Sequence, residues 1–227
     1  MDRLRMALIG GGGAGFIGKV HATAATLDRQ AELVAGALSS NPEKAKAAAI
    51  PFGIAPERAY ESYDALLESE SRRDQHDRAD FVSIATPNHT HFEIASAALR
   101  AGFHVVCDKP MTTTLKDAQE LVELAESSDR VFALTHNYSG YPLMRQAREM
   151  VAAGEIGDVI AVRVSYAQGW MHGVDPTATP SRGAWKSDPE KNGPGGSLGD
   201  VGTHAFHLAS FVSGLEPRTL LSQMNSY

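Results

Sequence analysis

The sequence predicts an α/β protein whose amino-terminal part is a doubly wound parallel sheet. Short apolar runs alternate with longer stretches of helical periodicity, and a glycine-rich turn directly follows the first apolar run. Such alternation gives parallel strands joined by right-handed helical crossovers. Because both faces of such a sheet are covered, its strands are continuous apolar runs. We therefore predict five strands, at residues 4–9, 33–38, 81–85, 104–107 and 131–134.

Helices are predicted between these strands. Apolar residues recur at helical spacing from residue 17 to 27 and from 115 to 125. Pro42, directly after Asn41, opens another helix, because the first helical turn tolerates proline. The polar stretch 68–78 has no periodicity and predicts a solvated loop before the strand at 81.

The pattern changes after residue 134. We expect a helix at 142–153, a strand at 159–166, a glycine- and proline-rich loop with Trp170 and Trp185, a helix near His204 and a strand at 219–227. A domain boundary near His136 then separates a sheet domain, 1–136, from an α+β domain, 137–227. Because a sheet of two strands is marginal, we expect the second domain to be truncated, or to borrow strands from a partner in a homo-oligomer.

Composition limits the classes of ligand. The 227 residues are 43% hydrophobic and 21% charged, as in soluble globular proteins. A formal net charge of -6 argues against a nucleic-acid partner or an anionic membrane, both of which attract basic surfaces. The single cysteine, Cys107, excludes an intrachain disulfide framework and is expected to be a buried thiol. With no apolar signal-peptide core near the amino terminus, a cytoplasmic location is predicted.

The glycine-rich turn contains two overlapping matches to the GxGxxG pattern, at Gly10-Gly12-Gly15 and at Gly13-Gly15-Gly18. Glycines let the backbone approach a pyrophosphate, whose charge then lies on the N–H groups of the following helix. A strand before the turn and a helix after it favour a dinucleotide-binding Rossmann domain over a flexible loop. The candidate cofactor-binding residues here are Gly10, Gly12, Gly13, Gly15, Phe16 and Ile17.

The end of the second strand bears on the choice between NAD and NADP. An acidic residue often binds the adenosine ribose at this point, but the sequence is Ala37-Leu38-Ser39-Ser40. Ser39, a candidate cofactor contact, does not repel a 2′-phosphate, and Lys44 or Lys46 can reach one. We therefore expect NAD or NADP as cofactor and leave the preference open.

Two further strand ends point to the same edge of the sheet. Thr86, Pro87, Asn88 and His91 follow the strand at 81–85, where Pro87 stops the strand and Asn88 can cap the next helix. A metal pair of His89 and His91 is disfavoured because nothing nearby completes a ligand set.

Asp108-Lys109-Pro110 closes the apolar run 103–107. A lysine at the carboxyl end of a later strand points to the reacting end of a dinucleotide. The alternative is a solvated lysine in a proline turn.

Asp200 and His204 lie four residues apart, so a helical turn places both on one face. A histidine, with an ordinary pKa of about 6.5, can exchange a hydroxyl proton near neutral pH, and a neighbouring carboxylate can orient its ring. Taken alone, an aspartate N-cap and a core histidine explain the pair better. A metal site of Asp200, His204 and His207 is a weaker alternative, and we predict no bound metal.

At these residues the sequence resembles the Gfo/Idh/MocA family, the oxidoreductases related to glucose-fructose oxidoreductase and inositol dehydrogenase. The resemblance rests on four motifs in order along nearly the whole chain: the turn at 15–21, Thr86-Pro87-Asn88 with His91, Asp108-Lys109-Pro110, and Asp200 with His204.

The resemblance implies roles for single residues. Lys109 contacts the nicotinamide and the substrate and stabilises a developing alkoxide, His204 is the acid-base catalyst, and Asp200 assists it. The implied reaction is reversible hydride transfer between the nicotinamide and a secondary alcohol or ketone of a sugar, polyol or cyclitol. Asn137 lies where the family passes from its cofactor domain to its substrate domain and is a further cofactor contact, as is Asp108.

This chain departs from the family pattern at several points. The turn has extra glycines, Asp108 replaces the commoner glutamate, and His207 stands where many members have aspartate. Family members also continue well past this point. Two other functions remain open: a non-catalytic dinucleotide sensor on the same scaffold, and a metal-dependent lyase or hydrolase using Asp200, His204 and His207.

Overall fold

The computed structural model describes residues 3–13, 16–169 and 188–224. Its contacts divide the chain into two compact units. The first unit comprises Met1–Thr135 with Asp175–Asp200, and the second comprises His136–Val174 with Val201–Tyr227. The domains 1–136 and 137–227 stay a prediction of the sequence.

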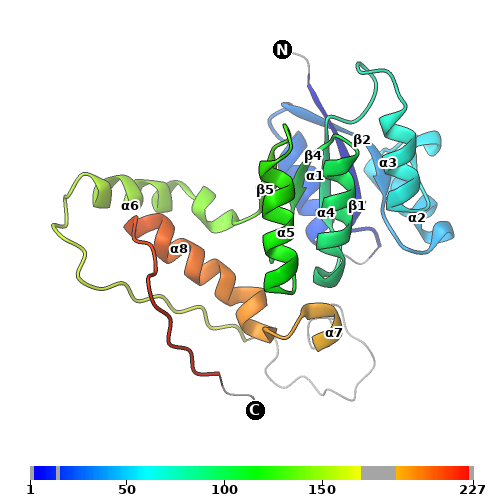
Figure 1. The fold of residues 1–227 in the computed structure, drawn as a ribbon. Coiled ribbons are helices and arrows are strands. Elements are labelled where there is room, and N and C mark those ends of the chain that lie inside the picture. The colour runs from blue at the N-terminus through cyan, green and yellow to red at the C-terminus, as the bar shows by residue number, and fades with distance from the viewer. Residues whose placement is uncertain (1–2, 14–15, 170–187, 225–227) are drawn as a thin grey trace. The chain divides into compact units, whose positions relative to one another are not determined.

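The first unit contains a five-stranded sheet in which every neighbouring pair of strands is parallel (Figure 1). The spatial order is β2-β1-β3-β4-β5. The strands are β1 (Leu4–Gly10), β2 (Ala31–Ala37), β3 (Phe81–Ala85), β4 (His104–Cys107) and β5 (Phe132–Leu134). All five predicted strands are confirmed, and so is the doubly wound α/β class.

Helices connect successive strands of this sheet. They are α1 (Ile17–Thr26), α2 (Pro42–Ala49), α3 (Tyr63–Ser71), α4 (His91–Arg100) and α5 (Leu115–Glu126). The predicted start at Pro42 is confirmed, because the Asn41 side chain accepts the Lys44 N–H at 3.0 Å as an N-cap. Ser62 and Thr114 cap α3 and α5 in the same way.

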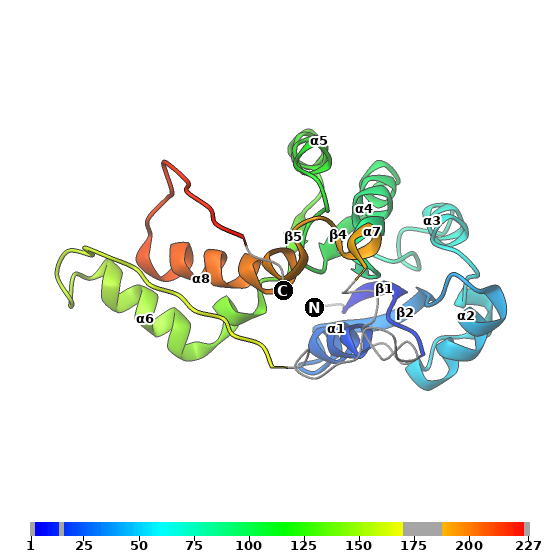
Figure 2. The ribbon, with the colours of Figure 1, turned by 90° about the horizontal axis from the view of Figure 1, so that it is seen from below.

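The sheet is covered on both faces, as its continuous apolar strands require. Figure 2 shows α4 and α5 on one face and α1 on the opposite face. Alternate residues of β1 enter different cores: Ala7 and Ile9 pack in one hydrophobic cluster, Met6 and Leu8 in the other. Cys107 is buried in the first cluster, as predicted. Burial raises the pKa of its thiol, which disfavours the reactive thiolate.

The strand order reverses between β1 and β3, the topological switch point at which ligands of such sheets bind. The last residues of these two strands are paired, Gly10 with Ala85. The glycine turn after β1 and the turn after β3 therefore start side by side at the carboxyl edge.

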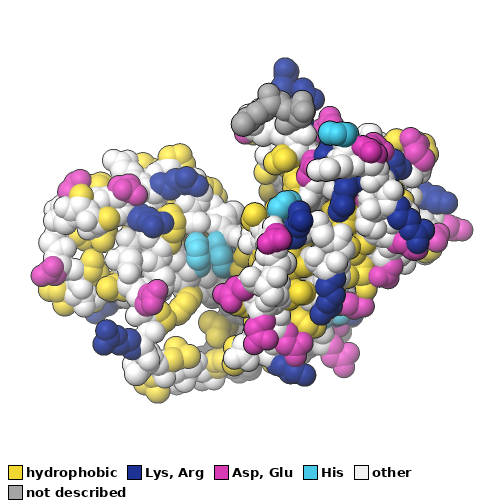
Figure 3. All heavy atoms as spheres, turned by 45° about the horizontal axis from the view of Figure 1, so that its top comes forward, with side chains coloured by type: hydrophobic (Ala, Val, Ile, Leu, Met, Phe, Trp, Pro, Cys, Tyr) yellow, Lys and Arg dark blue, Asp and Glu magenta, His cyan; other side chains and the backbone are white. Residues whose placement is uncertain are grey.

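Charge is mixed on the surface of the described residues. Figure 3 shows acidic and basic side chains interspersed on the face that it draws. Among the described residues, every helix is too short or too polar to cross a bilayer.

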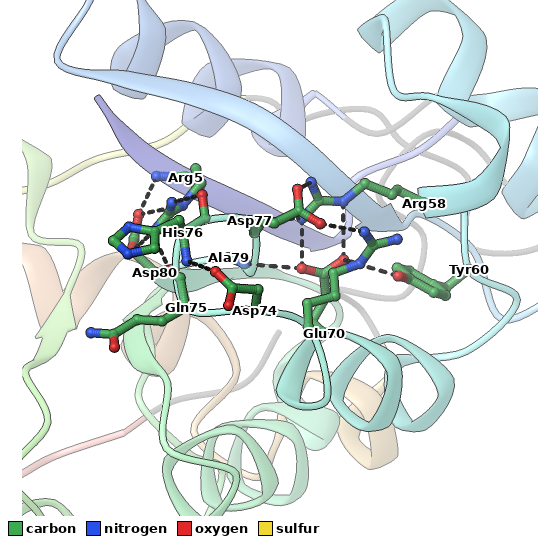
Figure 4. A network of polar contacts seen from close by, with 11 residues as sticks. Arg5, Arg58, Tyr60, Glu70, Asp74, Gln75, His76, Asp77, Ala79 and Asp80 are labelled. Carbon is green, nitrogen blue, oxygen red and sulfur yellow. Dashed lines mark hydrogen bonds and ion pairs between the residues drawn. The ribbon is translucent and has the colours of Figure 1, made fainter. Parts of the chain in front are cut away.

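The stretch 68–78 differs from the solvated loop predicted for it. Helix α3 continues to Ser71, and Glu70 is fully buried. The Glu70 carboxylate accepts hydrogen bonds from the Arg58 guanidinium at 2.6 and 3.1 Å, from the Tyr60 hydroxyl and from the Ala79 N–H (Figure 4). A buried carboxylate is stable only with such partners, and no local pattern in the sequence reveals partners that lie outside the stretch.

A second cluster in Figure 4 attaches β1 to the segment directly before β3. Arg5 and Asp80 form an ion pair at 2.6 Å, and Arg5 also donates to the carbonyls of Gln75 and His76.

The regular secondary structure in the described part of the second unit is helical. Helices α6 (Pro142–Ala152) and α8 (Thr203–Ser213) pack against each other, and Arg148 of α6 stacks over the Phe211 ring of α8 at 4.7 Å. The predicted helices at 142–153 and near His204 are confirmed.

The two strands predicted in the second unit are wrong within the described residues. Neither 159–166 nor 219–224 pairs with another strand there, and the side chains of Ile160 and Leu221 are 97% and 98% exposed. Alternation of apolar residues indicates only which side chains are favourable to bury, whereas a strand also needs a neighbouring strand for its backbone hydrogen bonds. Trp170, Trp185 and residues 225–227 lie outside the described residues.

Candidate active site

The glycine turn packs closely against its surroundings. A Cβ on Gly11 would lie 2.4 Å from the Gly18 Cα, and a Cβ on Gly12 would lie 2.4 Å from the Leu38 carbonyl oxygen. At Gly13, where φ is +67°, a Cβ would meet nothing within 4 Å. The turn therefore leaves a side-chain-free backbone before the amino terminus of α1, which fits a pyrophosphate.

The predicted cofactor contacts around this turn are only partly described. Gly10 ends β1, Phe16 is exposed and precedes α1, and Ile17 is its first residue. Gly15 lies outside the described residues. Gly11 belongs to neither GxGxxG match, yet it makes the closest approach to the helix. Only its place in a run of four glycines marked it in the sequence.

Ser39 lies just past the carboxyl end of β2, where an adenosine ribose would be bound. Its hydroxyl accepts the Asn41 N–H at 3.1 Å. Lys44 and Lys46 are exposed on α2.

Lys109 follows β4 and forms a nearly buried ion pair with Asp200. Its Nζ donates to the Asp200 Oδ1 and to the Asp200 carbonyl oxygen, both at 2.7 Å. The two side chains are 14% and 9% exposed. The solvated-lysine alternative is therefore wrong. Asp200 is not the cap of α8 either, because Gly202 occupies that position.

Asp108 holds the turn that carries the lysine. Its Oδ1 accepts the Lys109 N–H at 2.9 Å and the Thr135 hydroxyl at 2.8 Å. The peptide bond between Lys109 and Pro110 is cis.

The turn after β3 is held by buried side chains. Asn88 does not cap α4, whose N-cap is Thr90; instead its amide donates to the Asn192 Oδ1 at 2.8 Å. His91 is fully buried, with Nδ1 2.7 Å from the Pro110 carbonyl oxygen and Nε2 2.9 Å from that of Thr86. Thr86 also accepts the Thr90 hydroxyl at 2.8 Å. Nothing in the sequence marked Asn192.

His21 of helix α1 contacts strand β3 of the sheet. Its Nδ1 lies 2.7 Å from the Ser83 hydroxyl. Burial lowers the pKa of His21, partly opposed by the negative charge of Asp108.

In the second unit, aromatic rings surround His204. The Tyr138 ring packs edge-on against the imidazole with centroids 4.7 Å apart, and the Tyr138 hydroxyl hydrogen-bonds to that of Tyr166. His136 and His207 stack at 4.0 Å. Burial lowers the pKa of His207. Asn137, which lies between His136 and Tyr138 in the sequence, is exposed.

A cavity of about 230 Å³ opens beside His204. It is lined by Tyr138, Val164, Ser165, Tyr166, His204, Ala205 and Leu208. No pattern in the sequence marks Tyr138 or Tyr166 as site residues, because only the fold brings them beside His204. Within the described residues, no group of three or more histidine, cysteine, aspartate or glutamate side chains is arranged to hold a metal ion.

Comparison with known proteins gives related chains of known class. The curated relatives include an uncharacterized oxidoreductase of Bacillus subtilis, YfiI, 36% identical over 210 residues, which are 92% of this chain and 53% of the relative. Levoglucosan dehydrogenase of Pseudarthrobacter phenanthrenivorans is 32% identical over 94% of this chain and 52% of its own. This chain thus spans about half the length of these relatives.

A solved structure also matches most of this chain and about half of its own length. The inositol dehydrogenase homolog from Azotobacter vinelandii, in complex with NADH and myo-inositol, superposes with a TM-score of 0.83 at 39% identity. The match covers 93% of this chain and 52% of that one.

Models of two families match consecutive parts of the sequence. Residues 4–136 match the oxidoreductase family with an NAD-binding Rossmann fold, and residues 144–227 match the GFO/IDH/MocA C-terminal domain. The predicted nicotinamide dinucleotide is confirmed at the level of this NAD-binding domain, and the choice between NAD and NADP stays a prediction. The chain belongs to the Gfo/Idh/MocA family of oxidoreductases.

Proposed function

We propose that this protein is an NAD(P)-dependent dehydrogenase acting on a secondary alcohol or ketone of a small sugar, polyol or cyclitol. The observation that carries the proposal is the Lys109–Asp200 pair, a nearly buried ion pair just past the carboxyl end of β4. Removing a lysine and an aspartate from water is costly. A role of the lysine in acting on a ligand explains why this pair lies at the ligand-binding edge of a dinucleotide fold.

Each group has a proposed part in the reaction. The backbone of the glycine turn and the amino terminus of α1 bind the pyrophosphate. Lys109 donates a hydrogen bond to the substrate oxygen and stabilises negative charge as it develops there, while Asp200 fixes the ammonium group. His204 takes the hydroxyl proton in oxidation and returns it in reduction. The bound cofactor accepts or supplies the hydride.

The cavity beside His204 supports the choice of substrate class. At about 230 Å³ it is smaller than the pockets of about 300 Å³ and above that hold drug-sized ligands, so a single ring suits it. Aromatic walls offer apolar contact to the C–H groups of such a ring, and the paired hydroxyls of Tyr138 and Tyr166 can bind its hydroxyl groups. Two relatives are named for such ligands, levoglucosan and myo-inositol.

The remaining site assignments are proposals of the same kind. Ser39, Thr86, Pro87, Asp108 and Asn137 are proposed to lie along the cofactor. A cytoplasmic location and assembly as a homo-oligomer that completes the second domain stay predictions of the sequence.

The test combines cofactor binding with turnover. NADH and NADPH are titrated separately by fluorescence, and oxidation of levoglucosan, myo-inositol and a panel of aldoses and polyols is followed at saturating NAD and NADP. We expect binding of at least one cofactor, turnover of at least one cyclic polyol, and loss of kcat by a factor of about a hundred or more in Lys109→Met. Lys116→Met, on the exposed surface of α5, is the matched control and should keep full activity.

Two outcomes would contradict the proposal. Absence of binding for both cofactors would exclude a dehydrogenase. Binding without any turnover, with Lys109→Met and the parent indistinguishable, would favour the dinucleotide sensor.

A further inference from the structure

The turn after β3, residues 86–91, contacts both segments that carry the Lys109–Asp200 pair. His91 lies against the turn that holds Lys109, and Asn88 lies against the segment that leads to Asp200. Both side chains are buried and belong to the first compact unit, as do all their partners. Neither contact was expected from the sequence.

His91 fixes the lysine turn. Its two ring nitrogens face two backbone carbonyl oxygens, Pro110 at 2.7 Å and Thr86 at 2.9 Å. A single rigid ring therefore sets the distance between the end of β3 and the residue directly after Lys109. A phenylalanine fills the same space with no polar atom, so the shape of the ring and its polar contacts can be tested separately.

Asn88 fixes the aspartate segment. Its Nδ2 donates to the Oδ1 of Asn192 at 2.8 Å and to the Asn192 carbonyl oxygen at 3.1 Å. The Asn192 amide in turn donates to the Gly196 carbonyl oxygen at 3.2 Å, four residues before Asp200. Asn88 and Asn192 are 104 residues apart in the sequence, and both are buried. Two buried amides thus connect the β3 end to the stretch that ends in Asp200.

We propose that Asn88, His91 and Asn192 are positioning residues that hold the side chains of Lys109 and Asp200 at hydrogen-bonding distance from each other. A lysine side chain has many rotamers, and its ammonium group occupies one place only if its own backbone and its partner's backbone are both fixed. His91 fixes the first backbone and the Asn88–Asn192 contact fixes the second. The proposal rests on the proposed function only for its consequence in catalysis. The relative position of Lys109 and Asp200 is a property of the protein without ligand.

The first experiment measures the interaction between Lys109 and Asp200 and needs no enzymatic activity. A double-mutant cycle of Lys109→Met and Asp200→Asn is determined by urea unfolding in the parent chain and again in the Asn88→Ala background. We expect a coupling between Lys109 and Asp200 in the parent and its loss in Asn88→Ala. Equal coupling in the two backgrounds, or no coupling in the parent, would overturn the proposal. If Asn88→Ala does not fold, Asn192→Ser provides the background, with the same two outcomes.

The control is a histidine that also bonds to backbone but at the opposite edge of the sheet. His104, the first residue of β4, accepts the Val131 N–H at 2.9 Å through Nδ1. His104→Asn removes an imidazole from the same sheet and should leave the Lys109–Asp200 coupling at its parent value. A loss of coupling in this variant as well would show a general effect of destabilisation and contradict the proposal.

The second experiment reads the catalytic consequence once a substrate is known. In His91→Phe and Asn88→Ala we expect kcat to fall by about tenfold to a hundredfold, as for a displaced catalytic group, with little change in the KM for the cofactor. A change in KM with kcat retained would mean that these residues serve cofactor binding and would overturn the proposal. A chain with no turnover but with the predicted loss of coupling would contradict the proposed function and leave the positioning role standing.

Discussion

Individual polar residues of the first unit take their roles from distant partners. Lys109 stands out in the sequence by its place after a strand, and Asp200 by its spacing to His204. Their direct pairing at 2.7 Å, across 91 residues, appears only in the fold. Asn88 and His91 stand out by their motif, yet the structure shows them bonded to protein groups and buried. A motif identifies which residues matter more readily than it identifies what they touch.

One prediction at this scale concerns the pH dependence of stability. Burial lowers the pKa of His21 in the folded protein, so the unfolded chain binds more protons as the pH falls below about 6.5. The contribution of a neutral His21 is therefore complete above that pH and is lost as the pH falls through the lowered folded pKa. We expect the free energy of unfolding to decline over this range, measured by urea unfolding at a series of pH values.

The matched variants separate His21 from other groups. His21→Asn should flatten part of the decline, while His76→Asn, at an exposed position, should leave it as in the parent. An identical decline in His21→Asn and the parent would show that this imidazole does not contribute.

Among the elements, the connection between β2 and β3 shows how far a local pattern can mislead. Polar composition predicted a solvated loop at 68–78, and most of its residues are indeed exposed. Glu70, however, is fully buried under Arg58, Tyr60 and the Ala79 N–H. The network thus attaches the end of α3 to residues before it and after it within the same connection.

Removing the charge of Glu70 tests this attachment. Glu70→Gln removes the buried carboxylate closest to the Arg58 guanidinium and leaves only the pair with Asp77 at 3.3 Å, and loss of one member of a buried ion pair costs about 3–5 kcal/mol. Glu68→Gln, two residues earlier on the exposed side of α3, breaks only a surface pair with Arg72 and should cost about 0–1 kcal/mol. Chemical unfolding of the two variants compares them directly, and equal effects would contradict the assigned role of Glu70.

For the molecule as a whole, the two units differ in how their apolar side chains are used. The first unit buries its strands in two clusters on either side of the sheet. The second presents apolar side chains on segments without regular secondary structure, with Ile160 and Leu221 almost fully exposed. Stability should therefore depend on the sheet unit far more than on these segments.

Three alanine substitutions test this distribution. Leu121→Ala empties a fully buried position of α5 and should cost about 2–5 kcal/mol. Ile160→Ala should change the free energy of unfolding by less than about 0.5 kcal/mol. Leu115→Ala, on the same helix as Leu121 but 75% exposed, is the control and should resemble Ile160→Ala. A large loss at Ile160 would show that its segment is packed in solution.

The sequence by itself determined the doubly wound sheet, the position of its five strands, the glycine turn and the candidates Lys109, Asp200 and His204. The sheet, its strands and the glycine turn follow from periodicity and from residue types that the backbone needs locally, whereas the three candidates follow from their motifs and from the resemblance to a family. Only the tertiary structure decided that Lys109 pairs with Asp200, that Asn88 binds Asn192, that Glu70 is buried and that residues 159–166 form no strand in the described chain. Hydrogen bonds, ion pairs and strand pairing depend on partners far away in the sequence, and a local pattern carries no information about those partners.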